Sequence, residues 1–227
     1  AQRPAALVRK GDQAMLQADY YTALHYFRQA IERKAAPDIE FRLAEAAYQF
    51  KAFATAAEHY RNLTNSTAVQ QYPTTWLGLG KSLFAQGKYE EAEKMLLKAI
   101  MQSNIDESSY AFASAIYQIG FSYDARENPA RCKYYKQAQD LSSPERHSDI
   151  FTSASLGLIS YCSDSSSPEV RLGKMFGVLK RYSNDGSPGE LAHIHNSIGL
   201  LYGSLEQHAL AAEQYLKAHE MGLQVYE

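Results

Sequence analysis

The sequence predicts an all-α protein in which helical hairpins stack into an α-solenoid of about six repeats, and three observations support this fold class. A ring–x–x–Ala–x–x–x–large–x–x–Ala phrase occurs four times, with Leu63 in place of the last alanine in the second copy. A glycine or alanine stands twelve residues before the first alanine of each copy. The first three copies are 33 and 36 residues apart, close to the period of about 34 residues of a two-helix repeat. The phrase alanines are Ala23, Ala56, Ala92 and Ala211, and the preceding small residues are Gly11, Ala44, Gly80 and Gly199.

Each repeat is expected to contain two amphipathic helices, because apolar residues recur at intervals of three and four positions. The first helix carries the small residue and the second carries the phrase. We expect the two helices to approach closely at these positions, as at Gly80 and Ala92. Gly87 is expected to end the first helix of the third copy, because glycine tolerates a left-handed conformation there. Each hairpin leaves an apolar face uncovered and therefore needs a neighbour.

Four repeats are clear copies of the pattern, and the two in the middle are degenerate. The degenerate copies keep an Ile-Gly pair at Ile119-Gly120 and a Leu-Gly pair at Leu156-Gly157, with second helices expected at 129–141 and 168–182. The segment 184–189 contains asparagine, glycine, serine and proline, which predicts a hinge. We still expect one continuous solenoid over 1–227, as a fragment of a longer protein. The expected repeats are approximately 4–36, 37–70, 73–105, 106–142, 145–183 and 190–222.

The third copy carries a resemblance to a known family. Its segment Trp76-Leu77-Gly78-Leu79-Gly80, followed by the phrase that begins at Tyr89, resembles the tetratricopeptide repeat (TPR) family, whose repeat opens with W-x-x-L-G. The resemblance implies a right-handed superhelix whose first helices line a concave surface. It also implies that the partner is a protein or a peptide.

Composition and side-chain spacing predict a non-catalytic protein. A formal net charge of −2 and a pI of about 6.4 give no indication of binding to nucleic acid or to an anionic membrane. The histidines show no metal-ligand spacing. Cys132 and Cys162 are interpreted as small buried apolar residues, because two cysteines are too few for a disulfide framework. Since no constellation of catalytic groups is recognisable, we expect no enzyme activity, no metal, no cofactor and no small-molecule substrate.

The first helices of the leading repeats present a strip of side chains to the expected groove. Arg42 and Lys81 are suited to hold a carboxylate of the partner, and Tyr48 and Phe84 to supply apolar anchors. Aromatic residues at helical spacing also fit packing against the next repeat, so this alternative stays open for Phe84 and for Phe41. The predicted partner-binding residues are Arg9, Asp12, Arg42, Glu45, Tyr48, Gln49, Lys81 and Phe84.

The predicted function is a protein–protein interaction scaffold that binds a partner protein or peptide in the concave groove. A structural or oligomerisation segment and a regulatory module of a larger protein are the alternatives. A narrower resemblance concerns the setting: Asp19–Leu24, Phe41–Ala46 and Trp76–Gly78 are similar to the TPR segment of Bacteroidota lipoproteins for gliding motility and type IX secretion. That resemblance implies a periplasmic position at the outer membrane, within a membrane-protein complex. Without it, a cytoplasmic position is expected.

Overall fold

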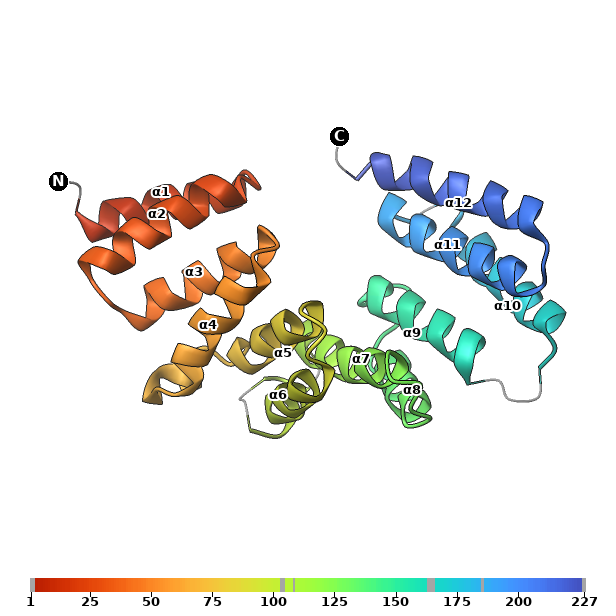
Figure 1. Ribbon diagram of the computed structural model, residues 1–227, viewed down its shortest axis with the longest axis horizontal. Coiled ribbons are helices and arrows are strands. Elements are labelled where there is room, and N and C mark those ends of the chain that lie inside the picture. The colour runs from red at the N-terminus through yellow and green to blue at the C-terminus, as the bar shows by residue number, and fades with distance from the viewer. Residues whose placement is uncertain (1–2, 103–104, 108, 163–165, 185, 226–227) are drawn as a thin grey trace. The chain divides into compact units, whose positions relative to one another are not determined.

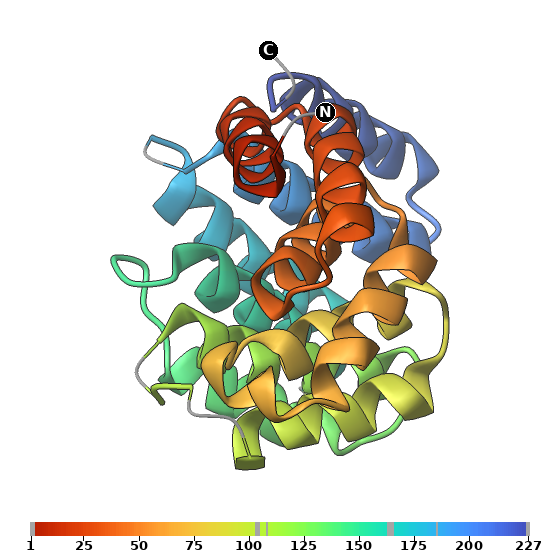
Figure 2. The same cartoon turned by 90° about the vertical axis from the view of Figure 1, so that its left-hand side faces the viewer.

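The all-α prediction is confirmed in a computed structural model (Figures 1 and 2). The structure describes residues 3–102, 105–107, 109–162, 166–184 and 186–225. Within these ranges the regular elements are twelve α-helices and one short 3₁₀-helix, without a strand. None of the helices described there combines the length and the apolar character needed to cross a membrane.

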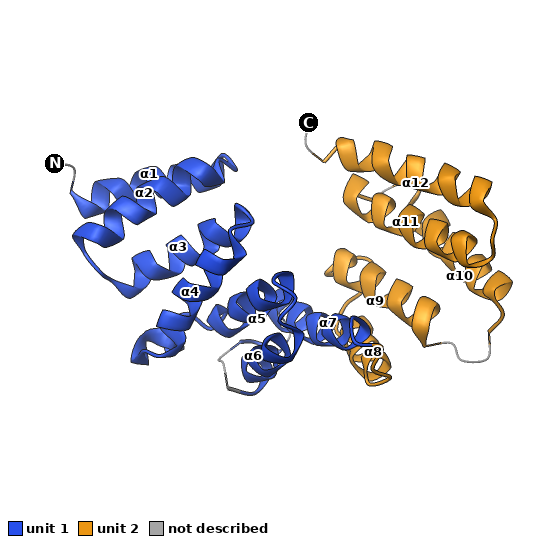
Figure 3. Cartoon of the chain, viewed as in Figure 1, with its two compact units in different colours: residues 1–126 blue, residues 127–227 orange. Residues whose placement is uncertain are grey.

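The chain divides into two compact units, which are described separately (Figure 3). Unit 1 is Ala1–Arg126 and unit 2 is Glu127–Glu227. One continuous solenoid and a hinge at 184–189 remain predictions, and residue 185 of that hinge lies outside the described residues. The helices of unit 1 are α1 (Pro4–Leu16), α2 (Tyr20–Arg33), α3 (Pro37–Gln49), α4 (Phe53–Thr64), η1 (Thr67–Gln71), α5 (Thr75–Ala85), α6 (Tyr89–Gln102) and α7 (Tyr110–Asp124). Those of unit 2 are α8 (Arg131–Asp140), α9 (Ser148–Tyr161), α10 (Pro168–Tyr182), α11 (Pro188–Ser204) and α12 (His208–Leu223).

In unit 1, consecutive helices pack as hairpins, and the small residue of the first helix fits against the large residue of the phrase. A Cβ atom on Gly11 would lie 2.4 Å from the Phe27 ring, and one on Gly80 would lie 2.6 Å from Leu96 Cγ. The carbonyl oxygen of Ala92 is the next neighbour of Gly80, at 3.3 Å. The close approach predicted at Gly80 is therefore present. Both neighbours of Gly80, the small Ala92 and the large Leu96, belong to the phrase.

The turn of four hairpins, three in unit 1 and the α11–α12 hairpin of unit 2, has a left-handed residue at the same position. Gly87 ends α5 with φ of +75°, as predicted. The amide of the residue after it donates to a carbonyl at the end of the first helix, from Lys88 to Leu83 at 3.0 Å, which is the bond of a Schellman cap. Residues that are not glycine take the left-handed conformation at the equivalent position of three other hairpins, namely Ala18 (φ 55°), Lys51 (φ 65°) and Glu206 (φ 59°).

Substitution of Lys51 by glycine is expected to raise the free energy of unfolding of unit 1 by about 0.5–1 kcal/mol, because a left-handed residue with a Cβ carries strain that glycine lacks. Urea unfolding followed by Trp76 fluorescence measures this, since the only tryptophan lies in α5 of unit 1. Lys34→Gly is the matched control: Lys34 is also an exposed lysine after a helix, but its φ is −152°. Equal stabilisation by both changes would contradict the conformational explanation.

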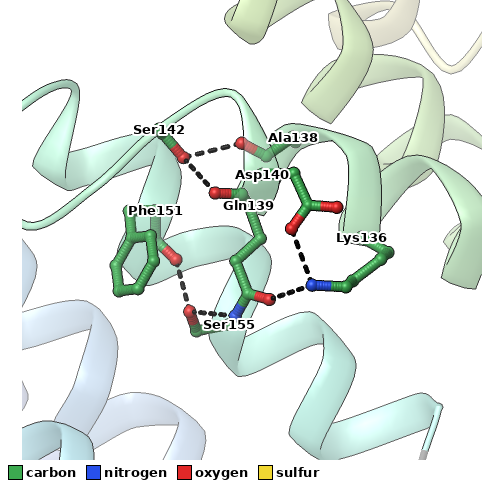
Figure 4. A network of polar contacts seen from close by, with 7 residues as sticks. All are labelled: Lys136, Ala138, Gln139, Asp140, Ser142, Phe151 and Ser155. Carbon is green, nitrogen blue, oxygen red and sulfur yellow. Dashed lines mark hydrogen bonds and ion pairs between the residues drawn. The ribbon is translucent and has the colours of Figure 1, made fainter.

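In unit 2, α8 and α9 pair as antiparallel helices through a ladder of contacts. Tyr135 is buried against Gly157, where a Cβ atom would lie 2.7 Å from the ring. One turn further, Gln139 Nε2 donates to Ser155 Oγ at 2.9 Å (Figure 4). Lys136 Nζ donates to Oε1 of the same Gln139 side chain at 3.4 Å and forms an ion pair with Asp140 Oδ1 at 2.6 Å. The glycine of the Leu156-Gly157 pair therefore packs against the preceding helix, whereas Gly80 packs against the helix that follows it.

The interpretation of the cysteines as separate apolar residues is wrong, because Cys132 and Cys162 form a disulfide. Their Cα atoms are 5.6 Å apart, within the usual range for a bridged pair. Cys132 lies in the first turn of α8 and Cys162 follows the last residue of α9. The antiparallel pairing of the two helices brings the cysteines together at the open end of the hairpin, although 30 residues separate them in the sequence.

The remaining helices of unit 2 share a second core. Leu156 of α9, Met175 of α10, and Ile194 and Ile198 of α11 are almost fully buried in one cluster. The second helix expected at 168–182 is observed as α10 with the same bounds, and that expected at 129–141 is the shorter α8. The last hairpin again places a glycine, Gly199, against the large residue of the phrase.

Candidate functional site

One cavity in unit 1 collects side chains from three first helices. Its volume is about 210 Å³. The residues come from the same face of α3, α5 and α7, at spacings of three and four, so successive repeats present equivalent positions to it. A small contribution comes from α4 and from the residue before α5. The lining residues are Glu45, Tyr48, Gln49, Tyr60, Thr74, Leu77, Gly78, Lys81, Tyr110, Ala111 and Ser114. Four predicted groove residues, Glu45, Tyr48, Gln49 and Lys81, therefore converge here.

The floor of this cavity, called the groove pocket below, is the ring of Tyr60. Tyr60 is 1% exposed. A Cβ atom on Gly78 would lie 2.3 Å from the ring, so only glycine lets α5 lie directly on Tyr60. The Tyr60 hydroxyl donates to the Glu45 carboxylate. Burial raises the pKa of Tyr60 far above its ordinary value, and the charge of Glu45 raises it further, so the hydroxyl stays protonated and keeps Glu45 in place.

One wall of the groove pocket is a cation–π pair. Lys81 Nζ lies 5.2 Å from the centre of the Tyr48 ring, which packs edge-on against Phe53 at 5.5 Å. Tyr48 is half-buried, and burial together with the Glu45 charge raises the pKa of its hydroxyl. The wall therefore combines a rigid aromatic surface with a positive charge, and Glu45 places a negative charge beside it.

Sequence reasoning missed the contribution of α7. Tyr110, Ala111 and Ser114 complete the groove pocket, although their repeat lacks the alanine phrase. A register of 33 residues would have found them: Glu45, Gly78 and Ala111 are equally spaced, and so are Tyr48, Lys81 and Ser114. Equivalent positions of neighbouring repeats thus form rows across the three helices.

Arg42 is occupied by interactions inside the chain and does not line the groove pocket. Its Nε donates to Asp12 Oδ1 at 2.9 Å, and its Nη1 lies 3.9 Å from Asp38 Oδ2. The Arg42 and Asp12 side chains are 38% and 44% exposed, so this pair contributes less than about 1 kcal/mol. Its evident role is to join α3 to α1. Arg9 is exposed on α1, away from the groove pocket.

The two aromatic residues for which packing was the alternative do pack inside unit 1. Phe84 contacts the rings of Tyr89 at 5.0 Å and Phe121 at 4.9 Å, and it does not line the groove pocket. Phe41 stacks on Tyr72 at 5.0 Å and lies edge-on to Tyr60. Phe41 therefore packs against the Tyr60 floor of the groove pocket, whereas Phe84 belongs to a neighbouring aromatic cluster.

Comparisons with known proteins agree with this architecture. The pattern of the tetratricopeptide repeat family matches residues 73–104. A search of curated proteins finds no matching sequence. The apo form of the quorum sensor NprR from B. thuringiensis is similar over 89% of this chain and 60% of its own, with a TM-score of 0.72 and 14% identity. The apo form of RapI is similar over 98% of this chain and 98% of its own, with a TM-score of 0.67 and 14% identity. The chain has a TPR-type fold. YrrB, a TPR protein with an unusual peptide-binding site, covers 86% of this chain and 91% of its own, with a TM-score of 0.51 and 18% identity.

The groove pocket has the dimensions and chemistry of a site for one side chain. Its 210 Å³ is below the roughly 300–1,000 Å³ of small-molecule sites. Tyr48, Tyr60 and Leu77 supply apolar surface, while Lys81 and Glu45 present opposite charges at its edge. Within the described part of the chain, no three side chains of His, Cys, Asp or Glu are grouped to hold a metal ion.

Proposed function

We propose that the protein is a non-catalytic scaffold that binds an extended segment of a partner protein or peptide in the groove of unit 1. One large apolar side chain of the partner enters the groove pocket and rests on Tyr60. A carboxylate or carbonyl oxygen next to it accepts from Lys81, and Gln49 and Glu45 contact the polar groups that follow. Arg9, Asp12 and Arg42 flank the path on α1 and α3, and Phe84 belongs to the neighbouring aromatic cluster.

The observation that carries this proposal is the meeting of Tyr48, Lys81 and Glu45 over a fully buried aromatic floor. Interfaces obtain most of their affinity from a few aromatic and cationic anchors at a desolvated centre. Tyr48 and Tyr60 are held by Phe53 and Glu45, so little conformational entropy is lost when a partner binds. The description of YrrB as having a peptide-binding site supports the same use of a TPR-type fold.

Peptides selected by the full-length chain from a random displayed library are expected to carry a large apolar residue next to an acidic one. Lys81→Glu should lower the affinity for a selected peptide by about tenfold or more, because it replaces the attracting charge by a repelling one. Tyr48→Ala should cost at least as much, because it removes the wall of the groove pocket. Titration calorimetry measures both effects, with circular dichroism to confirm that the helix content is retained.

Lys94→Glu is the matched control, because it makes the same charge change on the exposed surface of α6. It should leave affinity within about twofold of the wild type. Equal losses in Lys81→Glu and Lys94→Glu would indicate general electrostatic attraction. Full affinity in both Lys81→Glu and Tyr48→Ala would remove the groove from the proposal.

We place the scaffold in an envelope assembly for secretion or motility, on the periplasmic side of the outer membrane. The resemblance of its N-terminal half to Bacteroidota lipoproteins motivates this setting. The Cys132–Cys162 disulfide supports it, because disulfides persist in oxidising compartments and are rare in the cytosol. Fractionation of the source cells with a tagged full-length protein tests the setting, and recovery with reduced thiols in the cytoplasmic fraction would contradict it.

An oligomerisation role is the second candidate, because α12 exposes several large apolar side chains, of which Leu216 and Leu223 share a face. Leu216 is 63% exposed, Leu223 54% and Leu210 41%. Such a surface is a candidate for contact with a second chain. Sedimentation that depends on protein concentration in the wild type, and is lost in Leu216→Glu, would favour this function. A monomer at all concentrations would leave the groove as the interaction surface.

A further inference from the structure

A second cavity lies in unit 2, far along the chain from the groove pocket, where α9 and α11 begin and α10 ends. Its volume is about 560 Å³, within the range of small-molecule sites. An adjoining hollow of about 200 Å³ shares Glu190 with it. The lining is mostly polar. The main cavity is lined by Pro144, Glu145, Ser148, Arg181, Tyr182 and Glu190, and the hollow adds Asp149, Thr152, Ser153, Ser187, Gly189 and His193.

Three buried polar atoms at this cavity make no hydrogen bond of normal geometry within the described residues. They are the Tyr182 hydroxyl, Thr152 Oγ1 and Glu190 Oε1. Thr152 is 1% exposed and Tyr182 is 6% exposed, so both side chains are withdrawn from the surface of unit 2. A buried polar group without a partner costs stability. Tyr182 lines the main cavity, Thr152 lines the hollow and Glu190 lines both, so these polar atoms are open to a ligand that fills the two connected spaces.

Glu190 supplies a fixed negative charge to the cavity. Ser187 donates to Glu190 Oε2 from its amide at 3.0 Å and from its hydroxyl at 2.8 Å, in a capping box at the start of α11. Burial acts to raise the pKa of Glu190, but the hydrogen bonds from Ser187, with the hydroxyl of Ser148, lower it below its ordinary value. One carboxylate oxygen is therefore satisfied by the helix start, and Oε1 remains available to a donor.

The other charges around Glu190 favour a cationic donor. Glu145 and Asp149 add two carboxylates, against the single guanidinium of Arg181. Partial desolvation lowers the pKa of His193, which reduces the positive charge that its imidazole adds. The N-termini of α9 and α11 offset part of the negative charge. The unpaired Oε1 atom itself still lacks a donor, and an ammonium group satisfies it most fully.

We propose that this cavity binds an ammonium group with an adjacent carbonyl, as found at the α-amino end of an amino acid or peptide. Glu190 Oε1 accepts from the ammonium, the Tyr182 hydroxyl donates to the carbonyl oxygen, and Thr152 Oγ1 accepts a second ammonium proton. The group is a ligand and undergoes no reaction here. This site is independent of the groove pocket, and either proposal stands if the other fails.

Stability provides the first test. Because the Tyr182 hydroxyl makes no hydrogen bond of normal geometry and has only a weak interaction with Thr152 in the fold, Tyr182→Phe should leave the unfolding midpoint of unit 2 nearly unchanged or raise it. Tyr60→Phe is the matched contrast, since the Tyr60 hydroxyl donates to Glu45 and its loss should lower the midpoint of unit 1. A clear loss of stability in Tyr182→Phe would show that its hydroxyl serves the fold and would overturn the proposal.

Binding provides the second test, by amide NMR titration of the full-length chain at pH 6.5 with alaninamide and N-acetylalaninamide. Alaninamide should shift signals of the first turns of α9 and α11, and the acetylated probe should not. Tyr182→Phe should lower the affinity for alaninamide about tenfold. Glu190→Gln, which keeps the capping box, should lower it about tenfold to 100-fold. No response to alaninamide, or an equal response to both probes, would overturn the proposal.

Two further probes distinguish the source of the ammonium group. If tetra-alaninamide binds at least as tightly as alaninamide, the natural ligand is a peptide N-terminus. If alanine binds as tightly as alaninamide and tetra-alaninamide does not bind, the natural ligand is a free amino acid whose carboxylate contacts Arg181. Spermidine has ammonium groups but no carbonyl. If it binds as tightly as alaninamide, the cavity attracts any polyamine, which would contradict the role given to the Tyr182 hydroxyl.

Discussion

Replacement of both cysteines by serine is expected to lower the free energy of unfolding of unit 2 by about 3.5 kcal/mol. The disulfide spans 30 residues, and a cross-link of this span removes on the order of 3–4 kcal/mol of chain entropy from the unfolded state. It joins the start of α8 to the end of α9. Among its described side chains, α8 buries only Tyr135 and Ala138, so apolar packing alone holds this helix weakly.

Urea unfolding with two probes separates the units in this experiment. Trp76, the only tryptophan, reports on unit 1, whereas far-ultraviolet circular dichroism reports on the helices of both units. The double variant should gain an early transition in circular dichroism and keep the wild-type fluorescence curve. Dithiothreitol should produce the same change in the wild type and none in the variant. Superimposed circular dichroism curves for the wild type, the reduced wild type and the double variant would show that the disulfide adds no stability.

The repeated phrase made the fold predictable, because each of its parts has a packing consequence that does not depend on distant sequence. Gly11 and Gly80 accept the side chains of Phe27 and Leu96 at a constant offset. Gly87 takes the left-handed turn that its position requires. Local patterns of this kind determine helix ends and hairpin contacts, and the stack follows from covering the apolar faces.

The groove pocket was predictable only in part. Glu45, Tyr48, Gln49 and Lys81 meet there because first helices in a stack present equivalent faces. The pairing of Arg42 with Asp12 depends on the relative rotation of α1 and α3, which hydrophobic periodicity does not define. An anion contact by Arg42 therefore competes with an interaction inside the chain, and this shifts our proposal towards Lys81.

The disulfide and the cavity of unit 2 could not be predicted, for the same physical reason. Cys132 and Cys162 belong to degenerate copies, where no phrase determines the register of α8 against α9. The three unpaired polar atoms come from α9, α10 and α11, and their meeting depends on how those helices cross. Residues that depart from the repeat pattern thus require the three-dimensional packing before a role can be assigned to them.

Replacement of Gly80 by leucine is expected to lower the free energy of unfolding of unit 1 by about 1–3 kcal/mol, the cost of an overpacked contact. The new Cβ atom would lie 2.6 Å from Leu96 Cγ and 3.3 Å from the carbonyl oxygen of Ala92. Leu96 is fully buried and the carbonyl belongs to the α6 backbone, so neither neighbour moves easily. The hairpin of α5 and α6 must open, and Trp76 fluorescence in urea reports this directly because Trp76 lies on α5.

Gly173→Leu is the matched control, because Gly173 also lies inside a helix but a Cβ atom there meets nothing within 4 Å. Leucine forms helices better than glycine, so this change should raise the stability of unit 2 by about 0.5–1 kcal/mol. The same gain in helix propensity is present at position 80, where the clash outweighs it. Opposite signs for the two variants would therefore isolate the packing effect. A wild-type midpoint for Gly80→Leu would show that α5 and α6 do not meet at this glycine, and the twelve-residue offset would then lose its structural explanation.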